Sequence, residues 1–129
     1  MLGTVQVTAF LATTHGHRAA AFYDGILGLP QLSEDAFALV FDLDGVELRV
    51  QKVDQLVPQP FTVLGWQVRD LQAVIASLMA RGVVFEAFPG LAQSAEGIWL
   101  APSGAQVAWF RDPDGNLLSI AEYPRPNDR

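Results

Sequence analysis

The first half of the chain begins with a strand pattern and continues with a helix pattern. Residues 5–12 are rich in β-branched and apolar side chains, which favours a strand, and Thr13-Thr14 supplies hydroxyls suited to capping a helix. Apolar side chains then recur at helical spacing over residues 19–27, until Gly28 and a nearby proline stop the helix. Residues 31–35 show no clear pattern. We therefore expect a strand followed by an amphipathic helix.

A β-hairpin is predicted next. Residues 37–43 and 46–51 each alternate apolar and polar side chains, and Asp44-Gly45 lies between them. An Asp-Gly pair between two alternating segments is a strong hairpin signal, because both turn positions favour a positive φ. A two-residue turn pairs Phe41 with Leu48, so the apolar side chains share one face of the sheet and can pack under the helix.

The second half repeats this order. Residues 61–68 form a strand pattern, and Asp70 is a suitable N-cap for a helix with one apolar stripe that ends at Gly82. Residues 106–111 and 116–123 give two further strands around an Asp-Pro-Asp-Gly turn. The recurrence indicates an internal duplication.

These elements predict an α+β fold in a single domain, residues 1–129. Its two modules cover about residues 1–54 and 61–123, a proline-containing connector joins them, and residues 124–129 form a proline-rich, frayed tail. Each module has a sheet with one helix-covered face and a second face that is either solvated or curled into a binding cavity.

Composition narrows the class of partner. The chain has 129 residues, of which 50% are hydrophobic and 17% charged, and it has no cysteine, which fits a globular domain without disulfides. A net charge of -6 with no basic run argues against nucleic acid. The N-terminus lacks a signal-peptide pattern, and no segment is long and apolar enough to span a membrane, so we expect a soluble, cytoplasmic protein.

Two segments resemble signatures of a known family. Residues 22–29 (FYDGILGL) and 110–116 (FRDPDGN) resemble those of the glyoxalase, bleomycin-resistance and extradiol-dioxygenase superfamily, also called vicinal oxygen chelate proteins. The resemblance covers nearly the whole chain. It implies two βαβββ modules whose mixed sheets form a cup with the helices outside, often completed by a dimer. It is specific for fold and weak for reaction, because the shared residues are turn and packing residues.

The resemblance also implies four positions at which family enzymes commonly bind a divalent metal. In this chain they are occupied by Thr8, Arg49, Val63 and Ser119. An arginine offers no lone pair to a metal and its charge repels one. We therefore predict no metal and no other cofactor. His15 and His17, the two histidines of the chain, are interpreted as loop residues; the alternative is that one acts as an acid or base over the pocket.

The side chains on the open faces are the candidate ligand-binding residues. Arg49 should hold either a ligand anion or a neighbouring carboxylate, namely Glu47 or Asp42. Trp99, predicted to lie in the loop 97–102, could stack on a planar ligand. Whether Trp109 or Phe110 faces the cavity depends on the length of the Asp-Pro-Asp-Gly turn and stays open. The full candidate set is Thr8, Phe10, Arg49, Gln67, Trp99, Trp109 and Ser119.

The leading hypothesis is a metal-independent protein that sequesters an aromatic or amphipathic small molecule, resembles bleomycin-resistance proteins and forms a homodimer. The net negative charge is compatible with a cationic ligand. One alternative is a glyoxalase-like or dioxygenase-like lyase or isomerase with a non-standard active site, which would use a relocated metal or Arg49 with a histidine. Another is an accessory domain that recognises a protein.

Overall fold

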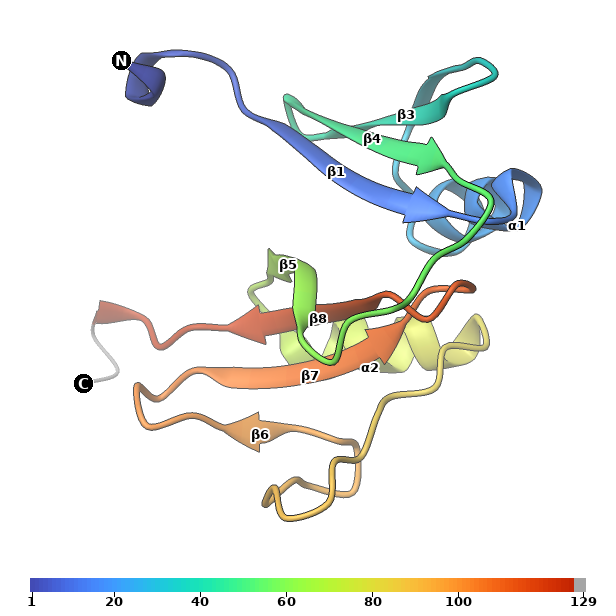
Figure 1. The fold of residues 1–129 in the computed structure, drawn as a ribbon. Coiled ribbons are helices and arrows are strands. Elements are labelled where there is room, and N and C mark those ends of the chain that lie inside the picture. Colours follow the sequence, from blue (N-terminus) through green and yellow to red (C-terminus); the bar gives the residue numbers. More distant parts are fainter. Residues whose placement is uncertain (127–129) are drawn as a thin grey trace. The chain divides into compact units, whose positions relative to one another are not determined.

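The chain folds into two compact units that have the same element order. The structure, a computed structural model, describes residues 1–126. One unit comprises residues 1–58 and the other begins at Gln59. Each contains a strand, a helical segment and three further strands, which form one four-stranded mixed sheet (Figure 1). The predicted α+β fold of two βαβββ modules is confirmed.

The first unit is built around the predicted hairpin. Its elements are a 3-10 helix at Leu2–Thr4, β1 (Thr8–Thr13), α1 (Gly16–Ala20), a π-helix (Ala21–Ile26), β2 (Gln31–Glu34), β3 (Ala38–Leu43) and β4 (Val46–Lys52). The sheet order is β1-β4-β3-β2, with β1 parallel to β4 and the other pairs antiparallel. Phe41 pairs with Leu48, as predicted, and both turn residues, Asp44 and Gly45, have positive φ.

Three local expectations for the first unit need correction. The strand begins at Thr8 rather than at residue 5. Residues 31–34 form the edge strand β2, whose irregular register against β3 explains the lack of a sequence pattern. The residue before α1 is His15, without a side-chain cap, and the Thr13 hydroxyl instead accepts a hydrogen bond from the His15 backbone N–H at 3.1 Å.

The second unit follows its predicted elements closely. It contains β5 (Thr62–Gln67), α2 (Leu71–Ala80), β6 (Trp99–Leu100), β7 (Gln106–Arg111) and β8 (Leu117–Glu122), in the sheet order β5-β8-β7-β6. The Asp70 carboxylate caps α2 by accepting the Ala73 N–H at 3.1 Å, and Gly82 adopts a φ of 94° beyond the helix end. Both termini of this helix were therefore readable from sequence.

The prediction that Trp99 lies in a loop was wrong. Trp99 begins the short strand β6 and pairs with Val107 of β7. A strand of only two residues has no alternation to detect, and it is defined only by its pairing with β7.

In the predicted tail, Pro124 lies against Gly104, where an added Cβ would be 3.1 Å from the proline Cγ. Residues 127–129 of this tail lie outside the described residues.

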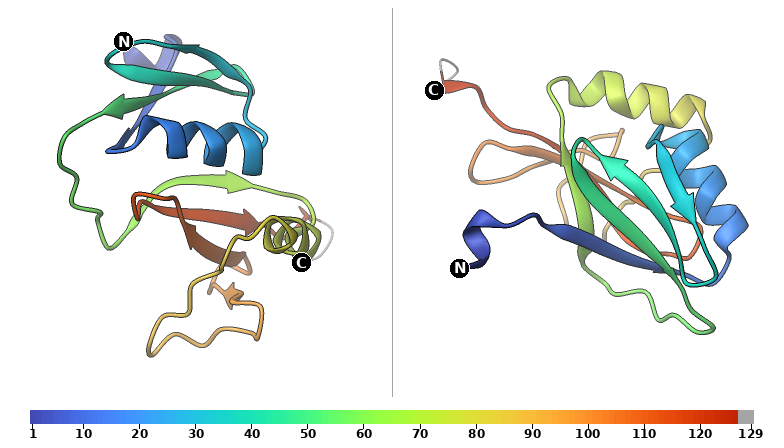
Figure 2. Two further views of the ribbon diagram at one scale, coloured as in Figure 1. Left: turned by 90° about the vertical axis from the view of Figure 1, so that its right-hand side faces the viewer. Right: turned by 90° about the horizontal axis from the view of Figure 1, so that it is seen from above.

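Each sheet has one face packed against the helix of its own unit (Figure 2). In the first unit Tyr23 is fully buried and its ring lies 5.7 Å from the buried Phe41. In the second, Phe110 and Leu118 are fully buried and paired across β7 and β8. Within residues 1–126, no helix combines the length and apolar character needed to cross a membrane.

Candidate functional site

The open face of the first sheet carries Thr8, Phe10, Glu47 and Arg49. The parallel register of β1 and β4 places Thr8 opposite Glu47 and Phe10 opposite Arg49. Phe10, on the edge strand β1, is 53% exposed and so presents apolar surface on this face. The sheet thus brings three of the candidate residues, Thr8, Phe10 and Arg49, onto one surface.

Arg49 is paired with Glu47, one of the two carboxylates that the sequence offered as its partner. The distance from Arg49 Nη1 to Glu47 Oε2 is 3.5 Å, and the two side chains are 34% and 45% exposed. An ion pair with this exposure contributes at most about 1 kcal/mol, because solvent screens it. Because the ion pair contributes so little, a ligand carboxylate could replace Glu47 as the partner of Arg49.

The four positions at which the resemblance implied a metal do not fit one. Thr8 and Arg49 lie on the first sheet, whereas Val63 and Ser119 lie on the second. Two hydroxyls, a guanidinium and an alkyl group supply no carboxylate, imidazole or thiolate. In the part of the chain that the structure describes, no three histidine, aspartate or glutamate residues gather into a possible metal site.

Trp109, and not Phe110, lies on the open face of the second sheet. Trp109 pairs with Ser119 across β7 and β8 and is partly exposed, whereas Phe110 is fully buried. Arg111 pairs with Leu117, so the connection between β7 and β8 is longer than a two-residue turn. A longer turn is the alternative for which the sequence predicts Trp109 on the open face. The structure therefore decides between the two alternatives.

A hydrogen-bonded turn fixes this choice. The Asp112 Oδ1 atom accepts the backbone N–H groups of Asp114 and Asn116, each at 2.9 Å, and Asn116 Nδ2 donates to Asp112 Oδ2 at 2.8 Å. Gly115 adopts a φ of 90°, which favours glycine. Asp112 and Asn116 are buried. Because the turn is held by both carboxylate oxygens, the register that presents Trp109 is well specified.

Three aromatic side chains form what we call the tryptophan cluster: Phe88, Trp99 and Trp109. The ring centroids of Trp99 and Trp109 are 6.0 Å apart with an interplanar angle of 35°. Phe88 meets Trp109 edge to face at 5.4 Å. The Trp109 indole N–H donates to Thr62 Oγ1 at 3.0 Å. All three rings are partly exposed, so they offer aromatic surface to a ligand.

Beside the cluster, a glycine makes room for the Ser119 side chain. Gly65 of β5 pairs with Ser119 of β8, and a Cβ added at Gly65 would lie 2.5 Å from the Ser119 hydroxyl oxygen. The serine side chain thus occupies the space that a side chain at position 65 would need. Gln67 is exposed further along the same strand, whereas Trp66, on the alternate face, is half-buried.

Sequence reasoning missed Phe88 and the ion pair that anchors its loop. Arg111 Nε lies 2.7 Å from Glu86 Oε1, and Arg111 Nη1 donates to the Gly115 carbonyl at 2.8 Å. The Gln93 side chain accepts the Phe88 N–H at 2.8 Å and so closes the loop on itself. Residues 86–97 show no periodicity. The only signal that could have suggested a role for Phe88 is that it is an aromatic residue next to a predicted loop.

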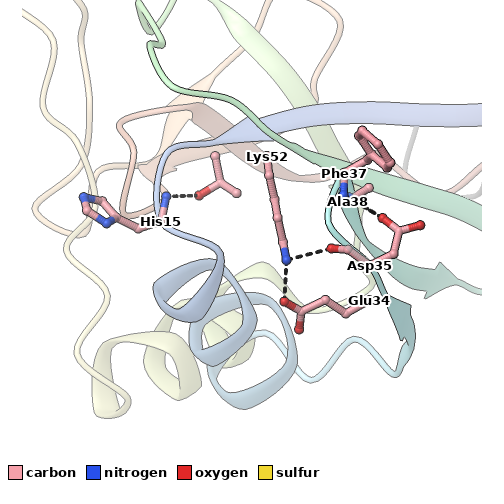
Figure 3. A network of polar contacts seen from close by, with 7 residues as sticks. His15, Glu34, Asp35, Phe37, Ala38 and Lys52 are labelled. Carbon is pink, nitrogen blue, oxygen red and sulfur yellow. Dashed lines mark hydrogen bonds and ion pairs between the residues drawn. The ribbon is translucent and has the colours of Figure 1, made fainter.

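The first unit contains a separate polar network around Lys52 (Figure 3). Lys52 Nζ donates to Glu34 Oε2 at 2.6 Å and to the Asp35 carbonyl at 2.8 Å, which ties edge strand β2 to β4. The hydrogen bond from Lys52 lowers the pKa of Glu34. Hydrogen bonds from the Phe37 and Ala38 N–H groups lower the pKa of Asp35. This network is a structural anchor, since its groups satisfy one another.

Comparisons with known proteins identify the fold. Neither a protein-family model nor a curated protein matches the chain. Among solved structures, a glyoxalase/bleomycin resistance protein/dioxygenase from Alicyclobacillus acidocaldarius is 19% identical, with a TM-score of 0.71 over 97% of this chain and 96% of that one. A bleomycin resistance determinant encoded on the transposon Tn5 is 23% identical, with a TM-score of 0.70 over 95% and 100%.

A lactoylglutathione lyase from Agrobacterium tumefaciens is also similar, at 17% identity and a TM-score of 0.71 over 92% of this chain and 93% of that one. Identities this low establish the fold and leave the reaction open. The two βαβββ units and these likenesses agree with the family that the sequence segments resembled. The chain has the fold of the glyoxalase/bleomycin resistance/dioxygenase superfamily.

Proposed function

We propose that the protein binds and sequesters a small aromatic or amphipathic molecule, without a metal, in the manner its likeness to a bleomycin resistance determinant suggests. The observation that carries the proposal is the tryptophan cluster on the open face of the second sheet. A ligand would stack on these rings, with the Ser119 hydroxyl on the neighbouring strand as a polar contact.

The cluster has the properties of a binding surface more than those of a core. Core aromatics such as Phe110 and Tyr23 are fully buried, whereas Trp99 and Trp109 keep part of their surface exposed. The indole N–H of Trp109 is already bonded to Thr62, so the ring faces are the part left for a ligand. Aromatic pairs contribute about 0.5–1.5 kcal/mol beyond the burial of their area.

The charge of the chain favours a cationic or neutral ligand. The net charge is -6, and indole rings attract cations placed over their faces. Thr8, Phe10 and Arg49 on the first sheet and Gln67 on the second remain predicted ligand contacts. A homodimer also remains a prediction, which sedimentation equilibrium can test.

Titration of intrinsic tryptophan fluorescence tests the proposal. The probes are bleomycin and ethidium, a planar aromatic cation. We expect saturable quenching with at least one of them, and Trp99→Ala and Trp109→Ala should each weaken binding about tenfold. Trp66→Phe is the matched control, because it removes an indole from the helix-covered face and should change the affinity less than about twofold.

Two results would contradict the proposal. One is that neither probe binds, or that the control variant weakens binding as much as the cluster variants do. The other is that protein purified without chelators carries stoichiometric Zn²⁺, Ni²⁺, Mn²⁺ or Fe²⁺ and shows turnover that depends on it. That second result would favour the lyase or isomerase alternative, which the likeness to a lactoylglutathione lyase makes worth testing.

A further inference from the structure

We propose that the second unit has another ligand site, which binds the carboxylate or phosphate group of a small, partly apolar molecule. The site is a pocket of about 390 Å³, within the size range of small-molecule sites. It contains none of the three aromatic residues of the tryptophan cluster, although Gln67, a predicted contact in the proposed function, also lines it. Its principal lining residues are Gln67, Arg69, Glu122, Tyr123, Pro124 and Arg125.

The topology of the sheet creates this pocket. β5 and β8 are parallel neighbours, so their carboxyl ends, at Gln67 and Glu122, lie at the same edge of the sheet. The Val68 N–H donates to the Ala121 carbonyl at 2.8 Å, which keeps the two segments together at the end of the strands. Beyond this point the segment after β5 leads into α2, whereas the segment after β8 continues into residues 123–126. The pocket lies between these two segments.

Two guanidinium groups line the pocket, although the chain as a whole is acidic. Arg69 and Arg125 are two of eight lysines and arginines in a chain with fourteen acidic residues. Within residues 1–126, no hydrogen bond or ion pair joins the Arg69 side chain to another residue. By contrast, Arg49, Lys52 and Arg111 each pair with a carboxylate. The Arg69 guanidinium, which lines the pocket without such a partner, is therefore available to a ligand.

The acidic groups at this edge are already engaged by the helix. Glu122 Oε1 accepts the Leu71 N–H at 2.8 Å, and Asp70 Oδ1 accepts the Ala73 N–H at 3.1 Å. Both carboxylates therefore satisfy the first turn of α2, where unpaired N–H groups and the helix dipole stabilise negative charge. Arg69 is left as a donor to an external anion.

The remaining walls define the rest of the ligand. Guanidinium groups bind carboxylates and phosphates through paired hydrogen bonds. Tyr123, a residue that is 52% exposed, and the pyrrolidine rings of Pro124 and Pro126 supply apolar surface. Pro124 lies against Gly104, so this apolar wall is continuous with the turn before β7. An oxyanion attached to a ring or short apolar group matches this combination.

Backbone-amide NMR titration of the full-length chain tests the site. The probes are benzoate, phenyl phosphate and inorganic phosphate, with benzylamine as the probe of opposite charge. We expect saturable shifts at residues 67–69 and 122–125 with benzoate or phenyl phosphate, and none with benzylamine. Arg69→Ala should weaken binding about tenfold, and Arg69→Lys, which keeps the charge but loses the planar fork, by less.

Arg18→Ala is the matched control, because it removes one exposed positive charge from the first unit. It should change the affinity less than about twofold. The proposal is overturned if neither organic anion gives saturable shifts at these residues, or if Arg18→Ala weakens binding as much as Arg69→Ala. Equal affinities for inorganic phosphate and phenyl phosphate would overturn the inference that the ligand is partly apolar. Loss of anion binding in the Trp99→Ala variant would also overturn the proposal, because it would place the anion site at the tryptophan cluster.

Discussion

Replacing Asp112 by alanine should destabilise the second unit by about 3–4 kcal/mol. The substitution removes the carboxylate that holds the turn between β7 and β8. Its two oxygens accept three hydrogen bonds, one from the Asp114 N–H and two from Asn116, at 2.8 to 2.9 Å. Because this turn places Trp109 on the open face, the same change tests how the candidate site is built.

The magnitude follows from what the three donors lose. A hydrogen bond to a charged group contributes about 1.5–3 kcal/mol, and a buried donor left without a partner costs about 1–3 kcal/mol. Asn116 is only 6% exposed, so water reaches its two donors poorly, whereas Asp114 is half-buried and its N–H can be solvated. We therefore count the two bonds from Asn116 nearly in full and the bond from Asp114 as a small addition.

Urea unfolding followed by circular dichroism and by tryptophan fluorescence measures this loss. Coincidence of the two transitions shows whether the units unfold together, which a single free energy of unfolding requires. Asp112→Asn, which keeps one acceptor oxygen, should lose about half as much. Asp24→Ala removes an exposed carboxylate from the π-helix and should change stability by no more than about 0.5 kcal/mol. A loss below about 1 kcal/mol in Asp112→Ala would refute the role given to this turn.

Two further predictions concern the sheets. Gly65→Ala should destabilise by about 0.5–1.5 kcal/mol, because its Cβ would lie 2.5 Å from the Ser119 hydroxyl and force that side chain from its rotamer. In a Ser119→Ala background the same change should be neutral or stabilising; additive free energies of urea unfolding would contradict this. The lowered pKa values of Glu34 and Asp35, below 4.5 and 3.8, mean that the unfolded chain binds more protons in acid. Their stabilisation is therefore present above pH 4.5 and lost as the pH falls through the lowered pKa values; urea midpoints from pH 6 to 2 should decline, and less steeply in Lys52→Met. A midpoint that is flat over this range would be inconsistent with the assigned hydrogen bonds.

Local chemistry determined much of this protein from sequence alone. The Asp44-Gly45 turn and the alternation around it specified a hairpin and the pairing of Phe41 with Leu48, because two consecutive positive φ angles admit few alternatives. Asp70 and Gly82 marked the two ends of α2 for similarly local reasons. From these elements alone, the repeated order already indicated two similar modules.

Only the tertiary structure decided which side chains meet on the open faces. Phe88 and Trp99 lie in segments without periodicity, and they join Trp109 because the loop is closed by side-chain hydrogen bonds and β6 pairs with β7. Arg49 had two possible carboxylate partners, and the geometry of the sheet selected Glu47. A sequence pattern reports the conformation of a few neighbouring residues, whereas a binding surface depends on contacts between segments far apart in the chain.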